Sequence, residues 1–186
     1  MIPYDDEVVR AFTVYHQLLE SWNNKVNLTS VTAWNVAVSR HYLDSATLVM
    51  SERFSSVCNT VGTSLIDVGT GPGLPGIVLK LLFPELRVTL LDASAKKCAF
   101  LKEACSVLSL RDVTIVSERA EMQAHVEGYR ESFDLVVSRA VAKLSVLAEY
   151  SLPLCRIGGN MIAMKGRSVD KELIDAKSAV QKLGGE

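Results

Sequence analysis

The fold is decided by residues 65–76, which read Leu65-Ile66-Asp67-Val68-Gly69-Thr70-Gly71-Pro72-Gly73-Leu74-Pro75-Gly76. A short apolar run ends in a carboxylate, a glycine-rich turn follows, and an apolar segment of helix length begins at Leu74 and runs to Phe83. Glycines let a backbone approach a ligand closely and adopt dihedral angles that a Cβ atom forbids. The order of strand, tight turn and helix N-terminus therefore predicts a cradle for a cofactor.

Two classes of cofactor fit this turn. Its glycines satisfy the spacing of the dinucleotide fingerprint, and Asp92 follows at about the distance that the fingerprint expects, so the glycines alone do not separate NAD from S-adenosylmethionine. Asp67 favours S-adenosylmethionine, because a carboxylate suits a ligand with an amino group and a cation and sits poorly beside a pyrophosphate. Pro72 and Pro75 also lack the amide hydrogens that a diphosphate needs. We therefore expect S-adenosylmethionine as the cofactor.

Outward from this motif, strand patterns alternate with helical ones. Strands are expected at residues 64–68, 87–92, 112–117, 133–138 and 160–164. Helices are expected at residues 74–83, 95–108, 121–129, 144–152 and 169–183. This alternation predicts an α/β, Rossmann-like fold, with a mostly parallel sheet that carries helices on both faces.

The first sixty residues show a different pattern. Apolar side chains recur at three-and-four spacing from Asp5 to Trp22, which predicts an amphipathic helix. Residues 36–54 are again helical in pattern, with a break expected near His41, and no strand pattern precedes Ser64. We therefore expect a helical N-terminal extension over residues 1–60 and an α/β domain over residues 61–186.

Composition narrows the class of protein. The 186 residues are 48% hydrophobic, enough for one core, and the net charge of −1 means that any RNA-binding surface is a local patch. The four cysteines show no C-x-x-C pair or metal-type spacing, which predicts buried thiols and no metal site. The chain begins with acidic residues where a leader would be basic, and no apolar run reaches membrane-spanning length. We expect a cytoplasmic protein with no membrane association.

Polar residues follow four of the expected strands. In an open parallel sheet, ligands bind beyond the carboxyl ends of the strands, where the strand order reverses. Asp67 and the glycine turn follow the first strand, and Asp92 ends the second, where ribose hydroxyls need an acceptor. Residues 118–121 follow the third strand, beside the place of an adenine ring, and residues 138–140 follow the fourth, facing the reacting end of a cofactor.

Several separated blocks resemble one known family. They include the Tyr15–Thr29 block, His41-x-x-Asp44-Ser45, Asp67–Gly76 with both prolines, Leu90–Ser94 with Lys97, Ser138-Arg139-Ala140 and Met164-Lys165-Gly166. Together these blocks resemble the bacterial 16S ribosomal RNA guanine-N7 methyltransferases, also called glucose-inhibited division protein B. The resemblance covers essentially the whole chain.

The resemblance implies a class I S-adenosylmethionine-dependent methyltransferase fold and, as partner, 16S ribosomal RNA or the small ribosomal subunit. It assigns the cofactor to Gly69, Leu74, Ala120, Glu121 and Arg139, with Asp92 as the acid on the ribose side, and it places the blocks around His41, Asp44, Arg139 and Lys165 toward the RNA. Family members carry a further antiparallel strand pair where this chain ends at Glu186. We therefore expect a shortened domain that lacks those strands. We also expect a monomer.

The chemistry fits a guanine N7 acceptor. This ring nitrogen has a free lone pair, so positioning and electrostatics can carry the transfer without a strong base. The fourth strand is followed by Ser138-Arg139-Ala140-Val141, not by the Pro-Pro-Tyr segment of amine-directed enzymes, and no Pro-Cys pair is present. We expect Arg139 to be the catalytic residue, orienting the base through guanine O6 or a flanking phosphate. We expect a cationic rim at the pocket mouth, formed by Lys25, Arg40, His41, Lys165 and Arg167.

Two other functions compete with this interpretation. A methyltransferase for a small molecule or a protein could use the same cradle, but the helical block around Trp22 matches the RNA-modifying family. A nucleotide-binding regulatory module is the third possibility. The presence of Asp67, Asp92 and Arg139 argues against such a degenerate pocket.

Overall fold

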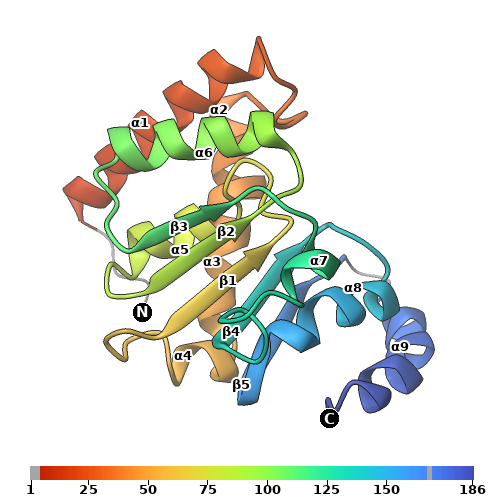
Figure 1. Ribbon diagram of the computed structural model, residues 1–186. Coiled ribbons are helices and arrows are strands. Elements are labelled where there is room, and N and C mark those ends of the chain that lie inside the picture. The colour runs from red at the N-terminus through yellow and green to blue at the C-terminus, as the bar shows by residue number, and fades with distance from the viewer. Residues whose placement is uncertain (1–4, 167–168) are drawn as a thin grey trace.

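The computed structural model describes residues 5–166 and 169–186. Its centre is a five-stranded sheet in the order β3-β2-β1-β4-β5, and every neighbouring pair of strands is parallel (Figure 1). The strands are β1 (Ser64–Val68), β2 (Arg87–Leu91), β3 (Val113–Val116), β4 (Phe133–Arg139) and β5 (Cys155–Met164). The strand order reverses between β1 and β4, and in open parallel sheets ligands bind beyond the carboxyl ends of the strands at such a point.

Helices cover both faces of the sheet. They are α5 (Gly76–Leu82), α6 (Ala95–Val107), α7 (Ala120–Gln123), α8 (Leu144–Ser151) and α9 (Asp170–Lys182). The larger core packs α5 and α6 against one face and includes Leu65, whereas the smaller core lies beneath α7 and α8 and includes Ile66. Successive residues of a strand point to opposite faces, so the apolar run of β1 is buried on both sides. Helix α9 packs against α8 at the margin of the molecule (Figure 1).

The N-terminal segment shares the larger core. Its elements are α1 (Asp6–Asn23), α2 (Trp34–Ala37), a π-helical turn (Val38–Leu43), α3 (Asp44–Ala46), a 3-10 turn (Thr47–Met50) and α4 (Glu52–Ser55). Asp5 caps α1 by accepting hydrogen bonds from the amides of Glu7 and Val8, at 3.0 and 2.9 Å. Tyr15 and Leu19 of α1 are fully buried in the same core as Leu65. The helical segment therefore covers the α5–α6 face as part of one hydrophobic core.

The structure confirms the alternation of strands and helices, and it differs from the expected elements most clearly at three places. Where a break was expected near His41, the chain continues through the π-helical turn, because a wider turn keeps the helical path. β5 begins at Cys155 instead of residue 160, and its pairing with β4 is irregular between Phe133 and Leu135. The two glycines at 158–159 hide this start, since glycine is a poor strand former. Helix α7 ends at Gln123 and not at residue 129. Turns carry the chain from there to Gly128, which has φ +83°.

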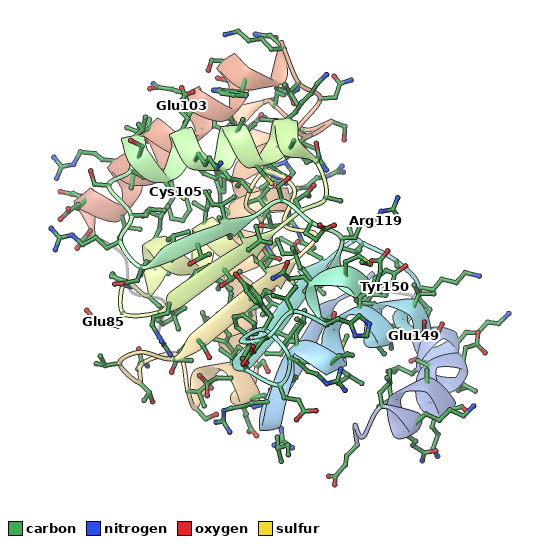
Figure 2. All side chains as sticks on the ribbon, in the orientation of Figure 1. Glu85, Glu103, Cys105, Arg119, Glu149 and Tyr150 are labelled. Atoms are coloured by element: carbon green, nitrogen blue, oxygen red, sulfur yellow. The ribbon has the colours of Figure 1, made fainter. Side chains whose placement is uncertain are left out.

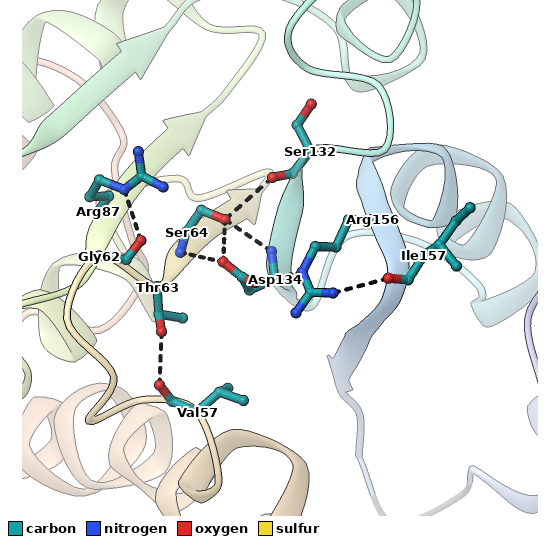
Figure 3. A network of polar contacts seen from close by, with 9 residues as sticks. All are labelled: Val57, Gly62, Thr63, Ser64, Arg87, Ser132, Asp134, Arg156 and Ile157. Atoms are coloured by element: carbon teal, nitrogen blue, oxygen red, sulfur yellow. Dashed lines mark hydrogen bonds and ion pairs between the residues drawn. The ribbon is translucent and has the colours of Figure 1, made fainter.

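A polar network connects three strands near their amino-terminal ends (Figure 3). Asp134 of β4 accepts hydrogen bonds from the hydroxyl and the amide of Ser64, at 2.6 and 2.8 Å, and pairs with Arg156 Nε at 2.6 Å. Burial alone would raise the pKa of Asp134, but these hydrogen bonds and the Arg156 charge outweigh it and lower the pKa. This network links β1, β4 and β5.

Among the described residues, no helix is both long and apolar enough to cross a membrane. The same part of the chain holds no cluster of side chains suited to a metal ion.

Candidate active site

The glycine turn connects β1 to α5 and opens toward the carboxyl ends of the strands. Gly69, Gly71 and Gly73 have φ angles of +69°, +60° and +97°, in the left-handed region that favours glycine. A Cβ atom on Gly69 would lie 2.6 Å from Val141 Cγ2, so the loop after β4 presses against the turn at that point. A Cβ atom on Gly71 would meet nothing within 4 Å. Gly71 therefore faces open space, as a residue that receives a ligand should.

Asp67 is fully buried at the end of β1 and braces the turn from within. Its Oδ2 accepts hydrogen bonds from Thr70 Oγ1 at 2.6 Å and from the Gly76 amide at the start of α5, at 2.8 Å. Its Oδ1 is buried and has no hydrogen-bond partner among the described residues. Burial raises the pKa of this carboxyl to about 6, although both hydrogen bonds oppose the shift. An unpartnered buried carboxylate oxygen is costly unless a cationic group binds to it.

Asp92 follows β2 and links that strand to the turn. Its Oδ2 accepts a hydrogen bond from the Gly71 amide at 2.9 Å, and its Oδ1 accepts one from the Ser94 amide at 2.9 Å. Lys97 Nζ lies 3.6 Å from Oδ2. Asp92 as a whole is only 7% exposed, and it contacts the turn from the strand end where the sequence predicts the ribose.

The expected residues after β3 lie at the start of α7. Ala120 is half-buried at the start of α7 and packs against the smaller core. Glu121 pairs with Arg119 across 3.5 Å, and Figure 2 shows Arg119 at this corner of the molecule. On the α5 side of the turn, Leu74 is buried in the larger core.

Arg139 ends β4 and reaches across to the N-terminal helical segment. Its Nη1 donates hydrogen bonds to the Arg40 carbonyl oxygen and to Asp44 Oδ2, both at 3.0 Å. The Arg139 side chain is 15% exposed, and that of Asp44 is 49% exposed. The guanidinium is therefore held at the boundary between the sheet and the π-helical turn, with its other donors making no hydrogen bond within residues 5–166 and 169–186.

A cavity of about 610 Å³ lies beside Arg139, between the π-helical turn and the ends of β4 and β5. Part of its wall is apolar and comes from Val31, Leu48, Ile162 and Met164. The polar part of the wall comes from Arg40, His41, Asp44, Thr47, Ser51, Arg139 and Lys165. This combination of apolar and charged side chains suits a flat, polar-edged ligand such as a nucleobase.

Only some of the residues expected in the cationic rim lie together. Arg40, His41 and Lys165 line the cavity, whereas Lys25 is exposed after α1 and is not part of its wall. Arg167 lies outside the described residues. Lys165 is held in place by Glu172 at 2.8 Å and by the Ala142 carbonyl oxygen.

His41 lines the cavity as a buried side chain and does not present an exposed positive charge. It is 8% exposed, and its Nε2 lies 3.0 Å from Thr29 Oγ1 and 3.2 Å from the Val31 carbonyl oxygen. Burial lowers its pKa, and the nearby Arg139 charge lowers it further. His41 therefore shapes the cavity as a neutral ring.

One contact of the site was missed by the sequence reasoning. Tyr15 of α1 is fully buried, and its hydroxyl donates a hydrogen bond to the Pro72 carbonyl oxygen of the glycine turn, at 2.5 Å. The spacing of α1 predicted Tyr15 only as a core residue. A tyrosine in an apolar stripe could have signalled more, because its buried hydroxyl needs a partner.

The parallel sheet and the glycine turn after β1 are those of the class I methyltransferase fold. The structure superposes on precorrin-6y C5,15-methyltransferase from Geobacter metallireducens with a TM-score of 0.52 and 17% identity, covering 71% of this chain and 68% of that one. A mutant of MtNAS in complex with S-adenosylmethionine gives a TM-score of 0.54 and 17% identity, covering 82% of this chain and 58% of that one. At such identities, the likeness concerns the fold alone.

Sequence comparison identifies the family. The family model described as GidB, rRNA small subunit methyltransferase G, matches residues 9–186. Ribosomal RNA small subunit methyltransferase G of Roseiflexus castenholzii is 45% identical over 98% of this chain and 75% of that protein. The protein of the same name from Bacillus cereus is 40% identical over 100% of this chain and 75% of that protein. The chain belongs to the rRNA small subunit methyltransferase G family, and it spans about three quarters of the length of these two relatives.

Proposed function

We propose that this protein transfers the methyl group of S-adenosylmethionine to N7 of a guanine in the 16S RNA of the small ribosomal subunit. Membership of the rRNA small subunit methyltransferase G family carries this proposal. The positions of Asp67, the glycine turn and Arg139 at the carboxyl ends of β1 and β4 support it. The family match disfavours the alternatives of a small-molecule or protein substrate.

The residues of the turn fit the cofactor. The unpartnered Oδ1 of Asp67 offers a buried negative charge that suits an ammonium group, and Gly71 leaves room for a ligand against its backbone. We propose that Asp67, Gly69, Gly71 and Leu74 hold the amino-acid end, that Asp92 holds the ribose hydroxyls, and that Ala120 and Glu121 flank the adenine. When bound, S-adenosylmethionine supplies a methyl group attached to a positively charged sulfur.

The other residues of the site would position the acceptor. The lone pair of guanine N7 is already available, so the protein has to orient the base and exclude water and does not need to remove a proton. Arg139 lies at the carboxyl end of β4 and lines the cavity, and it is the candidate to hydrogen-bond guanine O6 or a phosphate. The ion pair with Asp44 holds its side chain in that position.

The cavity wall is the proposed RNA-facing side. Arg40 and Lys165 supply positive charge there, and the ring of His41 forms part of the surface of the wall. On the basis of the sequence alone, Lys25 and Arg167 are also proposed to contact the RNA. A protein that modifies ribosomal RNA would work in the bacterial cytoplasm, and we propose that it acts as a monomer.

The direct test is transfer of labelled methyl groups to RNA from small subunits that lack this modification, followed by mapping of the product nucleoside. We expect label in 7-methylguanosine at one position. Protection of the protein against thermal unfolding by S-adenosylmethionine, and not by NAD, tests the cofactor separately. Protection without any RNA labelling would favour the small-molecule or protein substrate instead.

A further inference from the structure

The hydrogen bond between Tyr15 and Pro72 joins the N-terminal helical segment to the glycine turn. The two residues are 57 positions apart, and Pro72 lies between Gly71 and Gly73, which both have positive φ angles. The hydroxyl of Tyr15 therefore acts on the middle of the glycine turn.

The other hydrogen bonds of the turn come from the α/β body. The amides of Gly69 and Thr70 donate to the Leu91 carbonyl oxygen at 2.8 and 3.0 Å, and the amide of Gly71 donates to Asp92. The amide of Gly73 donates to the carbonyl oxygen of Thr70 at 2.9 Å, within the turn itself. Among the described residues, the contact from Tyr15 is thus the one side-chain hydrogen bond that the helical segment makes to this turn.

Tyr15 is itself held firmly. It is fully buried, and its ring lies 5.9 Å from the ring of Tyr42 and 6.3 Å from that of Phe100, measured between centroids. Burial raises the pKa of its hydroxyl well above the ordinary value, so the group stays protonated and acts as a donor. A rigid donor in a dry environment fixes its acceptor more strongly than a mobile or solvated one does.

We propose that Tyr15 is a positioning residue, whose hydroxyl holds the glycine turn in the shape that receives the cofactor. The N-terminal helical segment then takes part in cofactor binding, although none of its side chains needs to touch the cofactor. This inference rests on the proposed function, because it concerns the affinity for S-adenosylmethionine. Its physical basis is preorganisation: a turn with three glycines at positive φ loses much conformational freedom on binding unless it is already ordered.

Tyr15→Phe tests the proposal, since it removes the hydroxyl and keeps the ring in the core. We expect the dissociation constant for S-adenosylmethionine to rise about three- to tenfold, the typical range for loss of one buried hydrogen bond. At saturating cofactor, kcat for RNA methylation and KM for RNA should stay close to those of the wild type. Hydrogen exchange of the Gly73 amide in the ligand-free protein should become faster.

Tyr42→Phe is the matched control. Tyr42 belongs to the same aromatic cluster and is 5% exposed, and its hydroxyl lies 2.8 Å from His16 Nδ1 and not on the turn. Both variants should lose a similar amount of thermal stability, and only Tyr15→Phe should lose cofactor affinity. Calorimetry at a temperature far below both unfolding transitions separates affinity from stability.

Two results would overturn the inference. One is a cofactor dissociation constant for Tyr15→Phe within twofold of the wild-type value. The other is an equal loss of affinity in Tyr42→Phe, which would mean that softening of the core, and not the hydroxyl, is responsible. If the wild-type protein itself bound no S-adenosylmethionine, the proposed function would fail together with this inference.

Discussion

Arg139 has two possible tasks at the end of β4, and its contacts allow them to be separated. One nitrogen, Nη1, is committed to the N-terminal segment through Arg40 and Asp44. An ion pair with a half-exposed partner such as Asp44 contributes little to stability, so its role is better understood as orientation. The guanidinium is thus presented to the cavity in one direction.

Replacing Arg139 with alanine should therefore impair methyl transfer more than cofactor binding. We expect kcat/KM for RNA to fall about 100-fold, the size of effect that misplacing a reacting group produces. Calorimetry should show the dissociation constant for S-adenosylmethionine changing much less. If cofactor affinity fell as far as the transfer rate, Arg139 would be a cofactor ligand and not an orienting residue.

Asp67 makes the ligand-free protein sensitive to pH. Its pKa is about 6 in the folded protein, against an ordinary value of 3.8, because it is buried. Between these values the unfolded chain releases this proton and the folded protein keeps it, so the free energy of unfolding falls as the pH rises from about 4 to about 6. Urea titrations across this range should show the fall in the wild type and a smaller one in Asp67→Asn.

The affinity for S-adenosylmethionine should depend on pH in the opposite sense to the free energy of unfolding. Above about pH 6 the carboxylate of Asp67 is charged and can pair with an ammonium group, so binding should strengthen as the pH rises through this value. The Asp67→Asn variant should bind more weakly and lose this dependence. A dependence that survives in the variant would assign the titration to another group.

At the scale of elements, the glycine turn can be tested by comparing two glycines with similar backbones. Gly71 and Gly128 have φ angles of +60° and +83°, and a Cβ atom on either would meet nothing within 4 Å. Alanine at either position should cost about 1–2 kcal/mol of stability, since a left-handed conformation disfavours a Cβ atom. Urea unfolding measures this cost.

Only the variant in the turn should affect the cofactor. Gly71→Ala places a methyl group in the space that we assign to S-adenosylmethionine, so its dissociation constant should rise at least about tenfold, as 1.4 kcal/mol of steric cost would produce. Gly128→Ala lies after α7, away from the turn, and should bind normally. Equal affinities for the two variants would show that the cofactor does not approach Gly71.

The elements that the sequence predicted well are those with local causes. The apolar run before Asp67 and the glycines after it specify β1 and the turn without reference to distant residues. The start of β5 could not be predicted, because pairing with Phe133 of β4 draws Cys155 into the sheet despite the glycines that follow it. The π-helical turn around His41 likewise depends on packing that no local pattern records.

At the scale of the whole molecule, the proposed ligand-binding residues and a stabilising polar network lie at opposite ends of the strands. The glycine turn, Asp92 and Arg139 gather at the carboxyl ends of the strands, whereas Ser64, Asp134 and Arg156 join the strands nearer their amino ends (Figure 3). This second network has no cofactor or RNA residue in it. Stability and ligand binding should therefore be separable by mutation.

Asp134→Ala tests this separation. It leaves the Ser64 hydroxyl and the Arg156 guanidinium without their acceptor, and should lower the free energy of unfolding by about 1–3 kcal/mol. Because the pKa of Asp134 is lowered in the folded protein, the stabilisation is present above its ordinary pKa of 3.8 and is lost as the pH falls through the folded value. The difference between variant and wild type should thus shrink in acid, with cofactor affinity unchanged at neutral pH.

The sequence by itself determined the order of the elements and the glycine turn, because apolar periodicity, glycines and acidic strand ends act over short distances along the chain. The family followed from the resemblance of several separated blocks. Tertiary structure alone decided which distant polar groups meet. Tyr15 reaches Pro72 across 57 residues and Arg139 reaches Asp44 across 95, and neither spacing leaves a local pattern. Packing of the N-terminal helices on the α5–α6 face brings these groups together, since only a shared hydrophobic core can hold them at hydrogen-bond distance.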